Sequence, residues 1–145
     1  MTDTSATPAP NRKALELARF LDDLDRAAVA GGRAFDALFN APPKGMSVHE
    51  ILPDKTFTRV SPAHTSFFGY STSEMVGRNA ADFVVLKETS ERAMTRKFAP
   101  GAALLPFNRT WVKKDGTEVS VMMLDRHIKD AQGHIIGIRT ACIEA

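Results

Sequence analysis

Apolar residues recur at alternating intervals of three and four near the start of the chain, with charged residues between them. The positions are Ala14, Leu17, Leu21, Leu24 and Ala28. This spacing predicts an amphipathic helix with one narrow apolar seam, within residues 11–33. Such a seam is typical of a coiled coil, so we expect this dimer helix to pair two copies of the chain. The alternative is that the stripe packs on its own domain, since two heptads are too few to decide.

Glycine and proline residues interrupt the helical pattern after residue 30. Gly31 and Gly32 should weaken or bend the helix, because glycine costs about 1 kcal/mol relative to alanine in a helix interior. A second short helix is predicted over residues 34–40, and the two prolines that follow end it. Residues 1–10 lack a hydrophobic run and are predicted to be a disordered lead.

Beyond residue 43 the pattern changes to short strands and short helices. Two strands are predicted first, joined by a turn that contains Pro53 and Asp54. Three short helices follow, the first of them capped by Ser61. Three longer strands complete the chain, and Asp115-Gly116 forms the turn between the first two. The predicted strands cover residues 46–51, 57–60, 107–112, 117–128 and 135–143, and the helices residues 62–68, 73–77 and 87–98.

Hairpins at both ends of this region, with helices between them, predict an antiparallel sheet with helices on one face, which is an α+β fold. The strand over residues 117–128 is mostly apolar on both faces, because Val121 and Met123 alternate with Met122 and Leu124. A half-solvated strand would be polar on one face. We therefore expect the second face to be covered too, by the N-terminal helix of the same chain or of a partner.

Composition and charge narrow the range of possible functions. The chain has 145 residues, 43% of them hydrophobic, which suffices for one domain core. A net charge of +2 without any basic run argues against direct binding of nucleic acid. No stretch is apolar for the roughly 18 residues that a membrane span needs, and nothing resembles an export signal. These features predict a cytoplasmic protein.

Several short motifs, in the right order, resemble those of PAS domains. Ser61-Pro62-Ala63 resembles their N-P-A motif, residues 68–71 their hydrophobic-G-Y-S, and residues 74–78 their E-hydrophobic-hydrophobic-G-R. Residues 113–117 are similar to the R-K-D-G-S hairpin, and residues 126–137 to the R-P-I-R-D ending with its two glycines. Residues 35–39 resemble the segment that leads into the domain. On this resemblance we assign residues 34–145 to a PAS domain.

The resemblance implies a PAS-like five-stranded antiparallel sheet that cups a small cavity, with short helices on one face. It also implies a sensory module of signal transduction, one that binds a small organic ligand and relays the signal through a dimeric helix. We expect a homodimer and an effector or partner protein such as a histidine kinase of a two-component system. The competing function is a ligand-free dimerisation or interaction module with a side-chain-filled core.

The resemblance places candidate ligand contacts on the elements that line the cavity in this family. Arg109 and Asn79 are the candidate polar anchors. Large apolar side chains either form a small-molecule site with a few polar groups or simply fill the core, and both alternatives stay open. The apolar candidates are Phe83, Met94, Phe98, Phe107, Trp111, Val121 and Met123.

A flavin is one cofactor to consider, because residues 77–80, Gly-Arg-Asn-Ala, resemble the G-R-N-C motif of flavin-binding LOV domains. Ala80 stands in the place of the cysteine and cannot form a flavin adduct, so light sensing is not expected. A dark, redox-active flavin remains an alternative. We expect Cys142, the single cysteine, to be a small buried core residue.

Haem is the other cofactor to consider, and it needs an axial ligand. The helix over residues 87–98, which usually supplies it in haem-binding PAS domains, contains no histidine. His127 and His134 are expected at the surface. His49 and His64 could point inward, although a hydrogen-bonded or solvated histidine is the plainer expectation.

Neither a metal site nor catalysis finds support in the residue spacing. We expect no metal, because no spacing of His, Cys and Asp suggests zinc or calcium. The sequence contains no phosphate-binding loop or catalytic triad order, and Glu118 and Asp125 are better explained by solvation. We therefore expect no enzymatic activity in this chain, which could be the regulatory part of a larger signalling enzyme.

Overall fold

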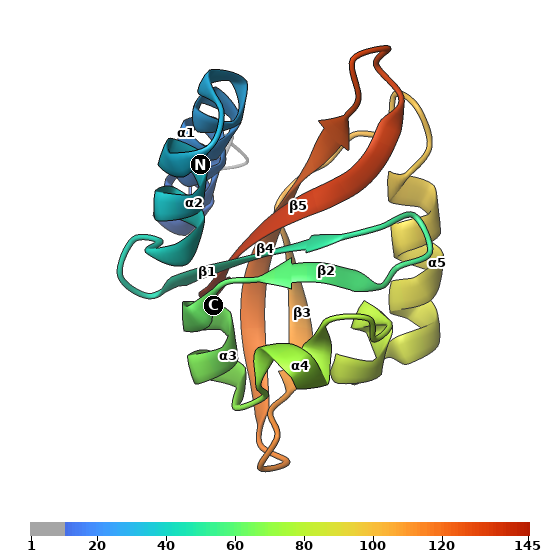
Figure 1. Cartoon of the computed structure of the whole chain (residues 1–145). Coiled ribbons are helices and arrows are strands. Elements are labelled where there is room, and N and C mark those ends of the chain that lie inside the picture. The colour runs from blue at the N-terminus through green and yellow to red at the C-terminus, as the bar shows by residue number, and fades with distance from the viewer. Residues whose placement is uncertain (1–10) are drawn as a thin grey trace, which may run out of the picture.

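The structure is a computed structural model, and it describes residues 11–145. The predicted disordered lead lies outside the described residues. No helix in the described part of the chain is long and apolar enough to cross a membrane. Along the chain the elements are α1 (Arg12–Ala30), α2 (Arg33–Asn40), β1 (Met46–Ile51), β2 (Phe57–Val60), α3 (Pro62–Phe68), α4 (Thr72–Met75), the 3-10 helix η1 (Ala80–Phe83), α5 (Lys87–Lys97), β3 (Phe107–Val112), β4 (Glu118–Lys129) and β5 (Ile135–Glu144) (Figure 1).

The five strands form one antiparallel sheet in the order β2-β1-β5-β4-β3. The predicted α+β fold is therefore confirmed. β1 and β5 pair in the centre, although almost the whole domain separates them in sequence. Helices α3, α4, η1 and α5 cover one face, which we call the inner face, while α1 and α2 cover the opposite, outer face (Figure 1).

Local sequence signals explain the short elements between the strands. Ser61 caps α3 through its side chain, Pro62 occupies the first turn, and Gly69 ends the helix at a φ of 86°. Ser71 caps α4 in a capping box. The turn η1 was not predicted, because four residues are too few to show a period; the side chain of Asn79 caps it.

Two glycines separate α1 from α2. Gly31 has a φ of 88° and Gly32 a φ of 64°, a backbone conformation that favours glycine. The predicted interruption of the helix is therefore a complete break, after which α2 lies beside α1 (Figure 1).

The apolar seam of α1 lies on the sheet of its own chain. Leu17, Leu21 and Leu24 are completely buried, in a cluster with residues of β1, β4 and β5 such as Val48 and Leu124. This is the arrangement that the sequence left open as an alternative. The two ends of the seam contribute less to this buried cluster, since Ala14 is half-buried and Ala28 is exposed. Association of two copies through α1 stays a prediction.

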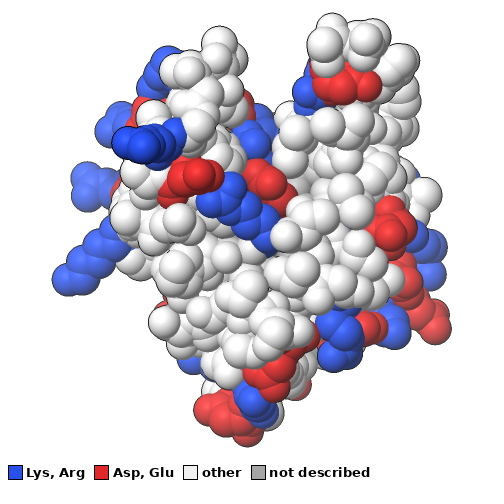
Figure 2. All heavy atoms as spheres, viewed as in Figure 1, with Lys and Arg blue, Asp and Glu red and all other residues white. Residues whose placement is uncertain are grey.

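Ion pairs join α1 to the outer face. Arg126 Nη1 lies 2.7 Å from Asp22 Oδ1, and Arg139 Nη1 lies 3.0 Å from Asp25 Oδ1. Arg139 Nε also lies 2.8 Å from Glu50 Oε2 on β1, and its side chain is only 8% exposed. In Figure 2, acidic and basic side chains lie next to one another where α1 and α2 meet the sheet. The ion pairs therefore help to orient α1 on the sheet, in addition to the apolar contact.

Leu21→Ala is expected to lower the free energy of unfolding by about 3 kcal/mol, because it leaves a cavity between α1 and the sheet. Leu15→Ala is the matched control: Leu15 is 54% exposed on the same helix, and its truncation should cost less than about 0.5 kcal/mol. Urea unfolding at equal protein concentrations measures both. Equal, small effects of the two substitutions would contradict the packing of α1 on the sheet.

Candidate functional site

Trp111 occupies the centre of the inner core. It reaches inward from β3, is 2% exposed, and stacks on Phe68 of α3 with ring centroids 4.3 Å apart. Its indole Nε1 donates to Met123 Sδ at 3.4 Å on the neighbouring strand. An indole that is stacked and hydrogen-bonded in this way is held in place, so Trp111 forms a fixed wall for whatever lies beside it.

A cavity of about 40 Å³ lies beside this tryptophan, between α5, η1 and the sheet. Packed side chains of the inner core occupy the space around it, and the remaining volume has room for about two or three water molecules. A haem or a flavin ring is far larger and does not fit the cavity as folded. Its apolar lining consists of Ile51, Ala80, Ala81, Val84, Met94, Phe107, Trp111, Met123 and Ile138, and its polar lining of His49, Ser90, Lys97, Arg109, Asp125 and Thr140.

Asp125 lies in the cavity wall, and the expectation that it is solvated was wrong. It is 4% exposed, because the alternation along β4 turns it to the inner face. Lys97, the last residue of α5, places Nζ 2.8 Å from Asp125 Oδ2, and Thr140 Oγ1 donates to Asp125 Oδ1 at 2.5 Å. Partners on both carboxylate oxygens offset the cost of burying this charge.

Two other polar groups at the cavity lack such partners. Ser90 is 4% exposed, and its Oγ has no hydrogen-bond partner among the described residues. The guanidinium of Arg109 lies over the Phe107 ring at 5.2 Å, and no ion pair between residues 11 and 145 includes it. Burial lowers the pKa of Arg109, an effect that the charge of Asp125 partly offsets. A buried hydroxyl without a partner and a half-buried cation without an ion pair therefore border this cavity.

His49 and His64 form a second polar group in the inner core. They are 3% and 0% exposed, and His49 Nδ1 lies 3.0 Å from His64 Nε2. Burial lowers the pKa of His49 to about 4, although the charge of Asp125 opposes this shift. Burial also holds the pKa of His64 well below its usual range. The two rings are thus a neutral, hydrogen-bonded pair at pH 7.

Cys142 lies next to this pair. Its Sγ is 3.9 Å from His49 Nδ1, and the residue is 2% exposed, as predicted for a small core residue. Burial raises the pKa of the thiol, so the side chain is protonated at neutral pH.

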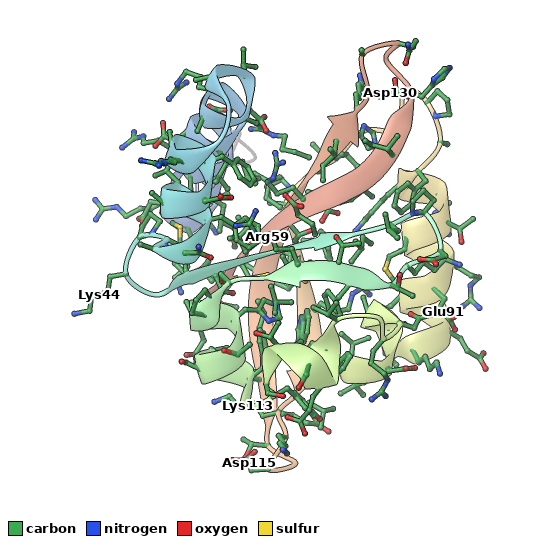
Figure 3. All side chains as sticks on the ribbon, in the orientation of Figure 1. Lys44, Arg59, Glu91, Lys113, Asp115 and Asp130 are labelled. Atoms are coloured by element: carbon green, nitrogen blue, oxygen red, sulfur yellow. The ribbon has the colours of Figure 1, made fainter. Side chains whose placement is uncertain are left out.

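Five of the nine candidate ligand contacts line the cavity: Met94, Phe107, Arg109, Trp111 and Met123. The other four lie elsewhere in the inner layer. Phe83 and Phe98 pack in the inner core, and Val121 is buried in it on the side of α3. Asn79 caps η1 and donates Nδ2 to Glu91 of α5 at 3.4 Å (Figure 3).

The remaining two histidines differ from each other. His134 is exposed, as expected, and lies beside Asp130. Figure 3 labels Asp130 in the turn between β4 and β5. The expectation for His127 was wrong, because it is half-buried and its Nε2 lies 2.6 Å from the carbonyl oxygen of Lys97 at the end of α5.

Sequence reasoning missed most of the polar cavity wall. The alternation along β4 and β5 could have placed Asp125 and Thr140 on one face, since their positions are opposite each other in the register. Ser90 and Lys97 gave no such signal, because α5 is mostly polar and only Ser90 in it is buried.

Comparison with known proteins shows one family. The family model described as "PAS domain" matches residues 43–144. No curated protein sequence matches the chain. Among solved structures, the PAS domain of an HTR-like protein from Haloarcula marismortui is 18% identical, with a TM-score of 0.61 over 88% of this chain and 98% of that one. The PAS domain of a protein from Colwellia psychrerythraea is 11% identical, with a TM-score of 0.65 over 76% and 92%. A domain of a sensory box sensor histidine kinase/response regulator from Geobacter sulfurreducens is 18% identical, with a TM-score of 0.64 over 77% and 91%.

Stability is expected to fall as the pH drops from 7 to 5. Histidines of the unfolded chain titrate near pH 6.5, whereas the pKa of His49 is lowered to about 4 and that of His64 is also well below its usual range. The unfolded state therefore binds more protons in this window, and acidification favours unfolding by up to about 1.4 kcal/mol per pH unit for each histidine.

Urea unfolding at a series of pH values measures this slope. His64→Phe should reduce it. A free energy of unfolding that is flat between pH 7 and 5 would show that the pair is not buried in its neutral form.

Proposed function

The chain belongs to the PAS domain family, and we propose that it senses a small carboxylate bound in the cavity between α5 and the sheet. PAS domains are regulatory sensory modules, so the family supplies the class of function. The ligand class is our proposal, and it rests on the chemistry of the cavity wall.

The observation that carries the proposal is the pair of unused donors, Ser90 and Arg109, at one cavity. The charges of Lys97 and Asp125 compensate each other at 2.8 Å, so Arg109 leaves the wall with an excess positive charge. A carboxylate accepts hydrogen bonds from a guanidinium and a hydroxyl together. Apolar walls that include Trp111 suit a short alkyl group, and the cavity volume limits the ligand to a few heavy atoms.

A second candidate function is the ligand-free interaction module. The small volume of the cavity favours it, since side chains such as Trp111 already occupy most of the inner core. The two functions differ in one measurable respect, because only the sensor gains stability when its ligand is added.

Formate and acetate are the first probes, added during thermal unfolding of the purified chain. A probe at 100 times its dissociation constant should stabilise the protein by about 2.7 kcal/mol. Arg109→Met should weaken binding by about 1.5–3 kcal/mol, roughly tenfold to a hundredfold, because it removes a charge-assisted hydrogen bond. The matched control Arg96→Met removes an exposed arginine of α5 and should bind as the wild type does. No stabilisation by any small carboxylate would favour the interaction module.

We propose that binding is relayed through β4 and β5 to α1. Asp125 and Thr140 are opposite each other in the register and face the cavity. The adjacent pair, Arg126 and Arg139, faces outward and holds carboxylates of α1. A ligand that changes the spacing of the inner pair therefore acts on strands that position the outer pair.

The two states of this relay are α1 on its own sheet and α1 paired with α1 of a second copy, with the outer faces of the two sheets buried against each other in the second state. Both states bury the same side chains, those of Leu17, Leu21 and Leu24, so one helix cannot adopt both states at once. A ligand shifts the balance only by its difference in affinity for the two states. The homodimer would present its helices to an effector, for which the Geobacter sulfurreducens sensor histidine kinase, similar in fold, suggests a histidine kinase.

Hydrogen exchange of the α1 amides tests the relay. Saturating formate or acetate, whichever stabilises the chain, should change α1 exchange several-fold, and sedimentation should show a matching change in the dimer fraction. Asp25→Asn should diminish this response, because it breaks the contact with Arg139. The control Asp23→Asn removes only a local pair with Arg26 on the same helix. Ligand binding without a change in α1 exchange would exclude the relay.

A further inference from the structure

Three side chains that commonly bind metals meet in the inner core. His49 comes from β1, His64 from α3 and Cys142 from β5, and they are 3%, 0% and 2% exposed. His49 Nδ1 lies 3.0 Å from His64 Nε2 and 3.9 Å from Cys142 Sγ. One donor atom from each residue lies within 4.8 Å of the other two. The three elements thus bring together a donor set that is widely separated in sequence.

Hydrogen bonds do not satisfy this cluster. Only one of the two nitrogens at the His49–His64 contact carries the hydrogen. With either tautomer, Nδ1 of His64 has no partner among the described residues. A buried polar atom without a partner is uncommon and destabilises the fold. Hydrogen bonds therefore leave this cluster incompletely satisfied, with one ring nitrogen of His64 unpaired among the described residues.

We propose that His49, His64 and Cys142 bind one Cu(I) ion. A metal ion with bonds of about 2.0 Å to nitrogen and about 2.3 Å to sulfur holds its donor atoms roughly 3.5 Å apart. The two distances from His49, 3.0 Å and 3.9 Å, lie within about half an ångström of this value. The donor atoms of His64 and Cys142 lie within 4.8 Å of each other and would approach by up to roughly 1 Å when the ion binds. On binding, the thiol of Cys142 releases its proton to solvent. The hydrogen between the two rings moves to the other nitrogen of its own ring, and the oxidation state of the copper does not change.

Charge and ligand number favour Cu(I) over zinc. Cu(I) with one thiolate and two neutral imidazoles carries no net charge, whereas zinc would leave a positive charge in the core, where an uncompensated charge is costly. The nearby ions of Lys97 and Asp125 are already paired with each other. Zinc also takes four ligands, whereas three side chains form this group in residues 11–145. Thiolate and imidazole are ligands that suit Cu(I).

A surface hollow borders one ligand of this site, Cys142. It has a volume of about 310 Å³ and lies between α3 and the strands β1 and β5. Its walls include Cys142 and Phe68. Because α3 also carries His64, a small displacement of this helix opens the hollow toward the donor set. His49 borders the carboxylate cavity as well, so the copper site adjoins that cavity without occupying it.

The test is an anaerobic titration of the purified chain with Cu(I) held by a chromogenic chelator. We expect the chain to withdraw one equivalent and to develop an ultraviolet band from thiolate-to-copper charge transfer. X-ray absorption should show one sulfur and two nitrogen neighbours. Failure to withdraw copper, or retention of zinc in preference to copper, would overturn the proposal.

Two variants identify the ligands. Cys142→Ala removes the thiolate, and His64→Phe replaces one imidazole by a ring that suits the neighbouring Phe68. Each should weaken copper binding by roughly a hundredfold or more, since even outer-shell partners of a metal contribute up to about a hundredfold. Circular dichroism establishes that the variants are folded. The control His134→Ala removes an exposed histidine and should leave copper binding unchanged. Binding that survives Cys142→Ala, or that is lost in His134→Ala, would contradict the site.

Discussion

The antiparallel pairing of β4 with β5 is the constraint on which the rest of the structure depends. Its register runs from Val121 opposite Glu144 to Lys129 opposite Ile135, and it assigns every side chain of both strands to one of two faces. Each face has its own partners, the short helices and α5 on one side and α1 on the other. A slip of one residue would exchange the two sets and place Arg126 in the cavity and Asp125 against α1.

The inner face combines two ways of placing titratable groups in a core. Asp125 keeps its charge because Lys97 and Thr140 contact its carboxylate oxygens. His49 and His64 are instead neutral, since burial has lowered the pKa of each. Asp125 and His49 both line one cavity. The carboxylate of Asp125 raises the pKa of His49, against the larger effect of burial. The charge of Asp125 therefore acts on the protonation of a neighbouring histidine at the same cavity.

Elements with strong local signals could be predicted from the sequence, and their partners could not. The boundaries of β1, β2 and α3 agree with the prediction, because proline, a serine cap and glycine mark them. The seam of α1 was recognised, but three buried leucines contain no information about which apolar surface covers them. The polar cavity was missed for a related reason. Lys97 and Asp125 meet only after α5 has packed over the sheet, and His49 and His64 come from different elements.

The outer layer has a consequence for where this domain can be cut. The segment that matches the family begins at residue 43, whereas the leucines that cover Val48 and Leu124 belong to α1. A fragment trimmed to the family limits would present that apolar face to water, and such surfaces promote aggregation. The apolar core of this chain therefore extends beyond the N-terminal end of the family-matched segment, and an expression fragment or a chimera is expected to need α1 or a substitute for it.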